Sequence, residues 1–547
     1  MLRKISAAFL GVILETIPNQ MFNFFRDVDS KTKLILTLKI SSSEKIPDNE
    51  SEKMVLMDPF IIPHWALINT LAASQIANKT SSKVMTFNFS KRNLSEDTLY
   101  RSLGVNSHLR IRLNLILFIK AIGVYVDLNR KVYSGVKIID LQIGKVNIGI
   151  DVYESYLRRG HPTVDLNSID LYRELWRGVK QYLYFKPLFI NEKVTALLVS
   201  HDNYVGPGLL ARMAFRYKVP VFLINPFEIN ILSRPFHLYE RFAHYRVYYS
   251  SQSEDWKELS LHKAQVELQR RVSGEIGIGT MSYQKKSAFT QHRIEKQILA
   301  TQNKKLLILS HDFFDNPHAY ARMLFDDFID WLSFVADCCA ENGIDCYIKL
   351  HRDFSDIEFQ IILEFQSKNP FIIIVDPEVS YHQLFDEGIR FVTTCYGSAG
   401  HELPLLGFTV INSSYNPHIA FSFNHHASTK EEYYNLLKDQ VPIVLDETLE
   451  HEIYMFYSVN SFLMWPDSYN MNSFNDFDSF CESDFLGQKA LRYLEDHVER
   501  IRELVSTNIQ EAISGERVFS VENNLPYELQ HNFLNETPYE LFYKKFK

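Results

Sequence analysis

Short apolar runs rich in β-branched residues alternate with longer stretches of helical periodicity in two parts of the chain. This alternation is typical of parallel sheets whose strands are connected by helices. The first part runs from about residue 50 to residue 285. It predicts, in order, strand Met54–Met57, helix Pro63–Asn78, strand Val84–Phe89, strand Ala196–Ser200, helix Gly208–Tyr217 and strand Val219–Asn225. Between these elements, Val132–Asp151 alternates apolar and polar residues, which predicts an antiparallel pair or an insertion.

The second part shows the same pattern more regularly. Its predicted strands are Leu306–Ser310, Cys346–Leu350, Phe371–Val375, Phe391–Thr394 and Thr409–Asn412. Its predicted helices are Ala319–Asn342, Ile357–Ser367, His382–Glu387 and Ala399–Leu406. Strands and helices in this order predict a doubly wound sheet. The polar segment Gln252–Lys305 is interpreted as connecting helices and a linker between the two parts.

The fold class is therefore expected to be α/β, with two Rossmann-like domains and further helices. A chain of 547 residues is too long for a single core, which also favours several domains. We expect an N-terminal helix and lead-in at residues 1–50, one Rossmann-like domain at 51–285, a second at 286–445, and a helical C-terminal extension at 446–547.

Composition narrows the class of protein. With 46% hydrophobic and 23% charged residues, the chain resembles ordinary globular proteins. A formal charge of −8 disfavours nucleic acid as a partner. The five cysteines lie in apolar patterns without metal-ligand spacing, which indicates buried thiols in a reducing compartment. Glu15 interrupts the only apolar run near the N-terminus, so we expect a cytoplasmic protein. The first 25 residues form either a helix docked on the protein or a peripheral contact with a membrane.

Candidate chemistry lies after the predicted strands, because ligands of open parallel sheets bind beyond the carboxyl ends of their strands. In the second domain these positions hold His311, Lys349, His351 and the segment Tyr396–Glu402. Gly397 and Ser398 stand where a turn enters a helix, whose free amides favour a phosphate. The alternative is a plain strand–turn–helix junction with a capping serine and an inward Glu402.

The basic residues suggest how negative charge is neutralised. Lys349 and His351 lie where a departing nucleotide phosphate needs positive charge. A lone histidine at a strand end is more often structural, so His351 keeps both interpretations. Asp326 and Asp327 fall in a predicted helix rather than in a metal-binding loop. We therefore expect no metal and no cofactor.

In the first domain, Asp202 follows a predicted strand and is a candidate general base, with His201 assisting or replacing it. Asp58, after the first strand, is the second candidate. Both aspartates have an alternative interpretation as turn or helix-capping residues.

One block of the sequence resembles a known family. The residues Thr394–Glu402, followed by Leu403–Gly407 and Val410–Asn412, resemble a block of bacterial GT-B glycosyltransferases of capsule and surface polysaccharide assembly. Ser310–Asp312 and Ile348–His351 resemble strand ends of the same group. The resemblance covers roughly residues 195–225 and 305–415.

This resemblance implies a glycosyltransferase that moves a sugar from a nucleotide-sugar to a glycan or lipid-linked acceptor. The donor site would comprise His311, Lys349, His351, Tyr396, Gly397, Ser398, Ala399 and Glu402, with Glu402 at the ribose. The acceptor would approach the N-terminal domain and Asp202, His201 or Asp58. Related chains have His-Pro where this one has His351-Arg352, so UDP, GDP and CMP donors stay open. A carboxylate base would favour inversion.

Two other classes of function remain at this point. A nucleotide-sugar epimerase or a polyol-phosphate transferase can share two Rossmann-like halves. A non-catalytic glycan-assembly protein can keep the fold without the chemistry.

Overall fold

The computed structural model describes residues 51–59, 63–88, 100–224, 229–278, 286–290, 294–318, 323–351, 354–463 and 502–510, apart from positions 102, 233, 236, 504 and 508. The predicted N-terminal helix and most of the predicted C-terminal extension lie outside these ranges. The chain divides into two compact units. Unit 1 contains Met1–Tyr156, Val164–Leu238 and Asp467–Lys547, and unit 2 contains Leu157–Thr163 and Tyr239–Pro466.

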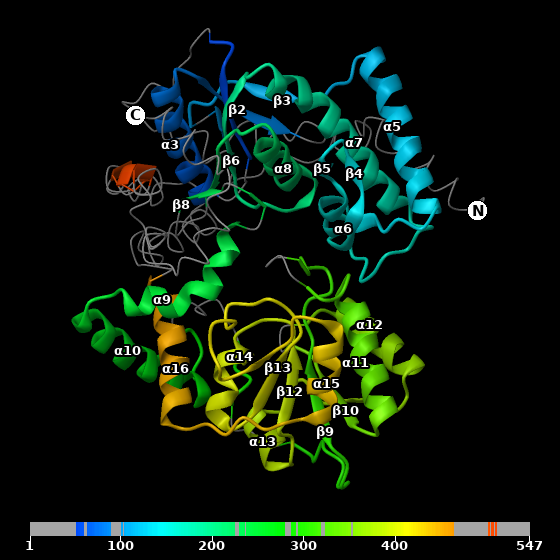
Figure 1. The fold of residues 1–547 in the computed structure, drawn as a ribbon, viewed down its shortest axis with the longest axis vertical. Coiled ribbons are helices and arrows are strands. Elements are labelled where there is room, and N and C mark those ends of the chain that lie inside the picture. The colour runs from blue at the N-terminus through cyan, green and yellow to red at the C-terminus, as the bar shows by residue number, and fades with distance from the viewer. Residues whose placement is uncertain are drawn as a thin grey trace, which may run out of the picture. The chain divides into compact units, whose positions relative to one another are not determined.

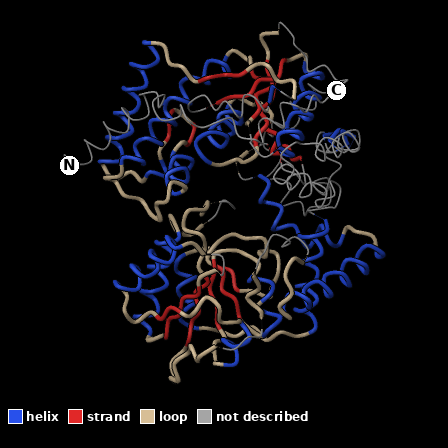
Figure 2. Tube along the Cα trace, turned by 180° about the vertical axis from the view of Figure 1, so that it is seen from behind, coloured by secondary structure: helices blue, strands red, loops and turns tan. Residues whose placement is uncertain are grey.

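Unit 1 is built on a six-stranded sheet, shown in Figures 1 and 2. Its strands are β1 (Met54–Met57), β2 (Lys83–Asn88), β3 (His108–Arg110), β6 (Val194–Val199), β7 (Val221–Ile224) and β8 (Ile229–Leu232). They follow the order β3-β2-β1-β6-β7-β8, and all pairs are parallel except β7 with β8. Numbered along the chain, this is the order 3-2-1-4-5-6 of the doubly wound dinucleotide-binding fold.

The helices of unit 1 are α3 (Pro63–Thr80), α5 (Leu115–Tyr133), α6 (Gly149–Leu157), α7 (Ile169–Ile190) and α8 (Leu209–Arg216). A short antiparallel pair, β4 (Gln142–Ile143) with β5 (Val146–Asn147), lies between α5 and α6. This pair confirms the prediction made for that segment. Val505 and Ile509 pack into the same core as β1 and α3, so part of the C-terminal region belongs to unit 1.

Unit 2 repeats the strand order of unit 1. Its strands are β9 (Lys305–Leu309), β10 (Asp345–Lys349), β11 (Ile373–Ile374), β12 (Phe391–Thr394), β13 (Thr409–Asn412) and β14 (His425–His426). Their order is β11-β10-β9-β12-β13-β14, and every pair is parallel. This is again 3-2-1-4-5-6, so the prediction of a doubly wound sheet is confirmed in unit 2.

The helices of unit 2 are α9 (Tyr245–Ser250), α10 (Glu254–Val272), α11 (Phe328–Asn342), α12 (Asp356–Lys368), α13 (Tyr381–Asp386), α14 (Ala399–Glu402), α15 (Lys430–Asp439) and α16 (Glu447–Ser458). Helices α11, α12 and α15 cover one face of the sheet and α13 lies against the other, as Figure 1 shows. Leu306 and Ile308 of β9 pack with α11, whereas Leu307 and Leu309 pack with α13. Burial on both faces explains why β9 is apolar from Leu306 to Leu309.

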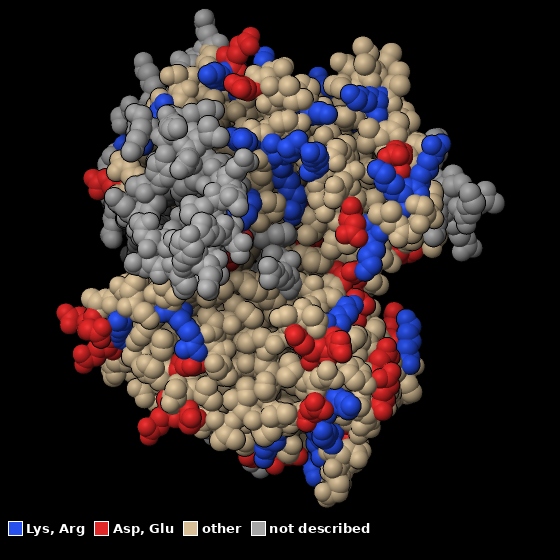
Figure 3. All heavy atoms as spheres, viewed as in Figure 1, with Lys and Arg blue, Asp and Glu red and all other residues tan. Residues whose placement is uncertain are grey.

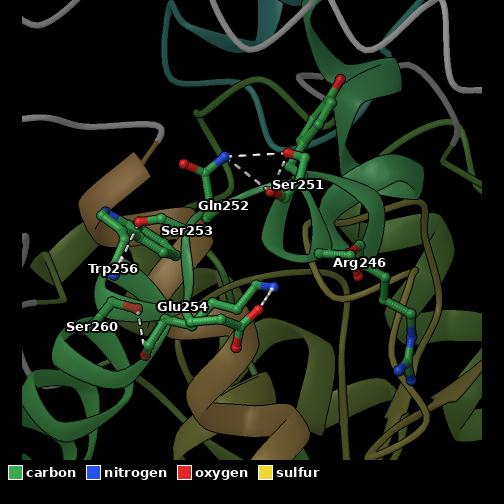
Figure 4. A network of polar contacts seen from close by, with 10 residues as sticks. Arg246, Ser251, Gln252, Ser253, Glu254, Trp256 and Ser260 are labelled. Atoms are coloured by element: carbon green, nitrogen blue, oxygen red, sulfur yellow. Dashed lines mark hydrogen bonds and ion pairs between the residues drawn. The ribbon is translucent and has the colours of Figure 1, made fainter.

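The boundary between the units differs from the predicted one near residue 285. Unit 2 begins at Tyr239, because α9 and α10 pack against α16. Figure 4 shows polar contacts at the end of α9, in the short connection that follows it and in the first turns of α10. Ser253 caps α10 by accepting from the Trp256 N–H at 3.3 Å, and Gln252 donates to the Tyr248 carbonyl at 3.1 Å. Helix α10 confirms the connecting helix predicted in this segment, but the helix belongs to unit 2 rather than to a linker between the units.

The predicted helix Ala319–Asn342 is too long, because α11 begins at Phe328. Asp327 is its N-cap rather than part of the helix, accepts from the Asp330 N–H at 2.8 Å and is buried. The predicted helix Ala399–Leu406 is also too long. Its helical part is α14, and a 3-10 turn follows at Pro404–Leu406.

Two further expectations concern thiols and membranes. Cys338, Cys339, Cys346 and Cys395 are buried free thiols, as expected, while Cys481 lies outside the described residues. Within the described ranges, no helix has the length and apolarity needed to cross a bilayer.

Candidate functional site

Each sheet has one topological switch point, where the strand order reverses. In unit 1 it lies between β1 and β6, and in unit 2 between β9 and β12. The crevice beyond the carboxyl ends of such a strand pair is the usual ligand site of this fold. In unit 1, Asp58 follows β1, and His201 and Asp202 follow β6. In unit 2, His311 and the segment Tyr396–Glu402 follow β9 and β12, whereas Lys349 and His351 lie at the end of the neighbouring strand β10.

The switch point of unit 1 is bridged by a hydrogen-bonded chain of three side chains. Asp58 follows β1, and its Oδ2 accepts from Ser200 Oγ, after β6, at 2.6 Å. His201 Nδ1 lies 3.0 Å from the same hydroxyl. Because the Ser200 proton points to Asp58, the hydroxyl can only accept from His201 Nδ1–H. This arrangement leaves the lone pair of the imidazole on Nε2.

Burial raises the pKa of Asp58, and its hydrogen bonds from Ser200 oppose that rise. His201 is half-buried, while Asp58 is buried. The more accessible group of the chain is therefore the imidazole, and the carboxyl group stands behind it.

Asp202 belongs to a second cluster that the sequence analysis missed. Asp151 of α6 forms a buried ion pair with Arg212 of α8, at 2.9 Å from Nε to Oδ2. Burial raises the pKa of Asp151 to about 7; Arg212 lowers it, and the nearby Glu154 and Asp202 raise it. Asp202 thus lies among acidic groups, which distinguishes its surroundings from those of His201.

The loop between β6 and α8 has an unusual backbone. Tyr204 and Gly206 have φ values of +70° and +138°. Ser155 Oγ accepts from the Val205 N–H at 2.7 Å, and Gln181 donates to the Gly206 carbonyl at 2.6 Å. A non-glycine residue with positive φ is strained, and such strain concentrates at functional sites. Buried side chains of α6 and α7 hold the loop in this conformation.

The switch point of unit 2 is bridged by His311. Its Nε2 lies 3.0 Å from Thr394 Oγ1, at the end of β12, and 3.4 Å from the Tyr396 amide nitrogen. The ring stacks on Phe328 with centroids 5.2 Å apart and contacts Tyr396 at 4.7 Å. Burial, followed by the charge of His351, lowers the pKa of His311 to about 4. His311 is therefore neutral at neutral pH and acts through hydrogen bonds rather than charge.

The turn after β12 presents backbone and a hydroxyl at the surface. Gly397 is exposed with a φ of +127°, where any side chain would be strained. The first hydrogen bond of the following turn runs from the Gly400 N–H to the Gly397 carbonyl at 3.2 Å. The Ser398 and Ala399 N–H groups precede it, so they stand at the open end of the helix. Tyr396 Oη donates to the Asn316 carbonyl at 2.8 Å and fixes the start of the turn.

Glu402 and Lys349 are bound to protein groups. Glu402 forms a buried ion pair with Arg271 of α10, and Ser398 Oγ donates to its Oε2 at 3.1 Å. Lys349 is 2% exposed, and its Nζ donates to the Pro377 carbonyl at 2.6 Å. His351, by contrast, is exposed at the end of β10. Glu402 and Lys349 thus support the rim, whereas His351, Gly397 and Ser398 reach its surface.

His401 of α14 forms a buried histidine pair with His418. His401 Nδ1 and His418 Nε2 are 3.0 Å apart, and both rings are buried against Phe456 of α16. Burial lowers the pKa of His401 to about 4 and that of His418 well below its ordinary value. These histidines are structural groups that the sequence analysis did not single out. Across the described part of the chain, no three His, Cys, Asp or Glu side chains are grouped as metal ligands.

Comparisons with known proteins identify no family for this chain. No protein-family model matches the chain, and no curated protein matches it. Among solved structures, the chain is similar to Thermosulfurimonas dismutans KpsC, described as a beta Kdo 2,4 transferase, at 10% sequence identity and a TM-score of 0.29. The match covers 50% of this chain and 81% of that one. A likeness at this level carries no argument about fold or function.

Proposed function

We propose that this protein is a glycosyltransferase of the GT-B type that transfers a sugar from a nucleotide-sugar to a glycan or lipid-linked acceptor in bacterial surface polysaccharide biosynthesis. The observation that carries the proposal is the repeated 3-2-1-4-5-6 sheet with polar groups at both switch points. The switch point of unit 2 offers backbone amides suited to an anion, with His351 at the end of the neighbouring strand. The switch point of unit 1 offers His201 with Asp58 as an orienting carboxylate. The sequence resemblance to GT-B enzymes of capsule assembly supports the same proposal.

The donor is proposed to bind at the rim of unit 2. Its phosphate groups would meet the N–H groups of Ser398 and Ala399 and the exposed ring of His351. Backbone N–H groups at a helix start favour anions without a metal ion. Buried Arg271, Glu402 and Lys349 would hold the rim in shape. His311 would fix the turn that carries Tyr396 and Gly397, through the contacts described above.

The acceptor is proposed to bind at the switch point of unit 1, with His201 as general base. His201 Nε2 would take the proton of the acceptor hydroxyl, and the oxygen would form a bond to the anomeric carbon. The bond from that carbon to the phosphate oxygen would break, and its electron pair would leave with the nucleotide. Asp58, acting through Ser200, would orient the ring and stabilise the imidazolium. Direct displacement of this kind inverts the anomeric centre.

Asp202 is the second candidate base. It lies close enough to Asp151 for its charge to act on that carboxyl group. We prefer His201 as the base, because the hydrogen bonds from Asp58 through Ser200 fix the tautomer of its imidazole ring.

The donor site is tested by nucleotide binding. We expect one of UDP, GDP, CMP or ADP, or its sugar conjugate, to raise the melting temperature of the purified protein, because a ligand of the folded state stabilises it by mass action. At a ligand concentration of 100 Kd the stabilisation is about 2.7 kcal/mol. The His351→Ala variant should lose about 1–3 kcal/mol of binding free energy, as for a hydrogen bond to a charged group.

The matched control is His262→Ala, because His262 is an exposed histidine of α10 that is not among the proposed donor-site residues. It should leave the shift unchanged. If no nucleotide shifts the melting temperature, or if both variants lose it equally, the donor site is placed wrongly.

A further inference from the structure

Helix α5 of unit 1 carries an apolar surface that no described part of the chain covers. Leu115, Ile116 and Ile119 are 74%, 78% and 62% exposed, and Ile122 and Val126 are 41% and 42% exposed. At 100° per residue, these side chains and exposed Tyr133 fall on one side of the helix and form a stripe along its length. A contiguous exposed apolar surface of this kind marks an interaction site.

The stripe is distinct from the face by which α5 joins the fold. Ala121, Tyr125, Leu128 and Val132 are buried on the opposite side of the helix. Tyr125 contacts Trp176 of α7 at 5.4 Å between ring centroids, and its hydroxyl donates to the Tyr172 carbonyl at 3.4 Å. Helix α5 is therefore apolar on two faces, and α7 packs against only one of them.

The charge around the stripe identifies the partner. Residues 108–137 contain six Lys and Arg side chains and a single acidic one, Asp127, although the whole chain has a formal charge of −8. The six are Arg110, Arg112, Lys120, Arg130, Lys131 and Lys137. Lys131 pairs with Asp127 at 3.0 Å. Figure 3 shows Lys and Arg side chains on the edge of the molecule where Figure 1 places α5.

We propose that α5 is a membrane-docking helix, which lies on an anionic bilayer with its apolar stripe among the acyl chains and its basic residues at the lipid headgroups. Apolar side chains next to cations are the pattern of helices that lie in the interface of anionic membranes. A second copy of the chain fits less well, because pairing the same surface would bring two strongly basic patches together. The inference does not rest on the proposed transferase activity.

The test measures binding of the full chain to vesicles by co-sedimentation. One set of vesicles contains phosphatidylcholine with phosphatidylglycerol, and the other contains phosphatidylcholine alone. We expect binding to the anionic vesicles, weaker binding as salt is added, and little binding to the neutral ones. The double variant Leu115→Glu/Ile119→Glu should weaken binding at least about tenfold, because it puts charge into the apolar stripe. Both positions are exposed, so the variant should fold.

The matched control is Leu259→Glu/Val266→Glu, which places the same two charges at exposed apolar residues of α10 in unit 2. It should bind vesicles like the unaltered protein. The proposal is overturned if the chain does not sediment with anionic vesicles, or if the α5 variant and the control bind equally. It is also overturned if light scattering shows a dimer that the α5 variant abolishes while vesicle binding persists. Nucleotide binding at the rim of unit 2 is unaffected by any of these outcomes.

Discussion

The side chain of Asp151 is fully buried, yet several charged side chains lie near it. Arg212 compensates its charge, while Glu154 and Asp202 add negative charge nearby. Burial outweighs the attraction of Arg212, so the pKa rises to about 7. The carboxyl group of Asp151 should therefore titrate in the folded protein close to neutral pH.

The stability of the protein should respond to this titration. Between the ordinary pKa of an aspartate and the raised pKa of Asp151, the folded state binds more protons than the unfolded state. The free energy of unfolding therefore falls as the pH rises from about 4 to about 7. Buried His311 and His401 act in the opposite direction, because their lowered pKa values make stability rise with pH below about 6.5.

The Asp151→Asn variant separates the two effects. Because an asparagine side chain does not titrate, the stability of the variant relative to the unaltered protein should increase steadily from about pH 4 to about pH 7. Chemical denaturation at several pH values measures this difference, in which the histidine contribution cancels. A difference that is constant with pH would show that Asp151 has an ordinary pKa.

Individual partners of the site residues could not be predicted from the sequence. Glu402 and Arg271 are 131 positions apart, and Asp58 and Ser200 are 142 apart. Contacts over such distances depend on how strands are ordered in a sheet, which periodicity does not report. The sequence did indicate that Asp58, His201, His311 and His351 follow strands. It left open whether Glu402 turns inward, and it could not indicate that Lys349 does.

At the scale of elements, the buried strands were predicted best. The bounds of β1, β12 and β13 match the predicted ones, and β9 and β10 are shifted by one residue. Both faces of these strands are buried, so their apolar runs are continuous and easily recognised. The short edge strands β3 and β14 were missed because runs of three and two residues carry no pattern. Helices α5 and α7 were also missed in the interpretation of unit 1.

The start of α8 offers a test of the loop that carries Asp202. A Cβ atom on Gly208 would lie 2.4 Å from Asp151 Oδ1 and 2.4 Å from the Asn203 backbone. Gly208→Ala should therefore destabilise the protein by about 1–3 kcal/mol, as for other overpacked sites. Gly123 in α5 has no atom within 4 Å of the corresponding position. Gly123→Ala should instead stabilise the protein by about 0.5–1 kcal/mol.

Denaturant unfolding of the two alanine variants checks this prediction. The two variants are a matched pair, since each adds one methyl group to a helix of unit 1. Gly208 stands at the start of α8, and Gly123 lies in the interior of α5. If both variants changed the free energy of unfolding in the same direction, the close packing of Gly208 against Asp151 would be contradicted.

At the scale of the whole molecule, the sequence predicted an α/β chain with two doubly wound parts, and the structure has two such units. The topology of each unit determines where its candidate site lies, because strand order decides which strand ends are neighbours. In both units the reversal falls between the first and fourth strands, and most of the predicted candidates follow these two strands, while Lys349 and His351 lie at the end of the neighbouring strand β10. The predicted domain boundaries near 50, 285 and 445 differ from the observed division, since units 1 and 2 are each assembled from separate segments of the chain.

The central claim is that this protein transfers a sugar with His201 as the base. The most direct measurement is the release of free nucleotide from UDP-, GDP- and CMP-linked sugars, each incubated with the protein in the presence and absence of a lipid and glycan extract of the source cells. We predict that one donor releases nucleotide only when the extract is present, and that His201→Ala lowers the rate about 10²–10⁴-fold, the range for a lost general base, while nucleotide binding persists. Interconversion of a nucleotide-sugar without any acceptor would indicate an epimerase, and bound nucleotide without turnover of any donor would indicate a non-catalytic protein; either result would contradict the account.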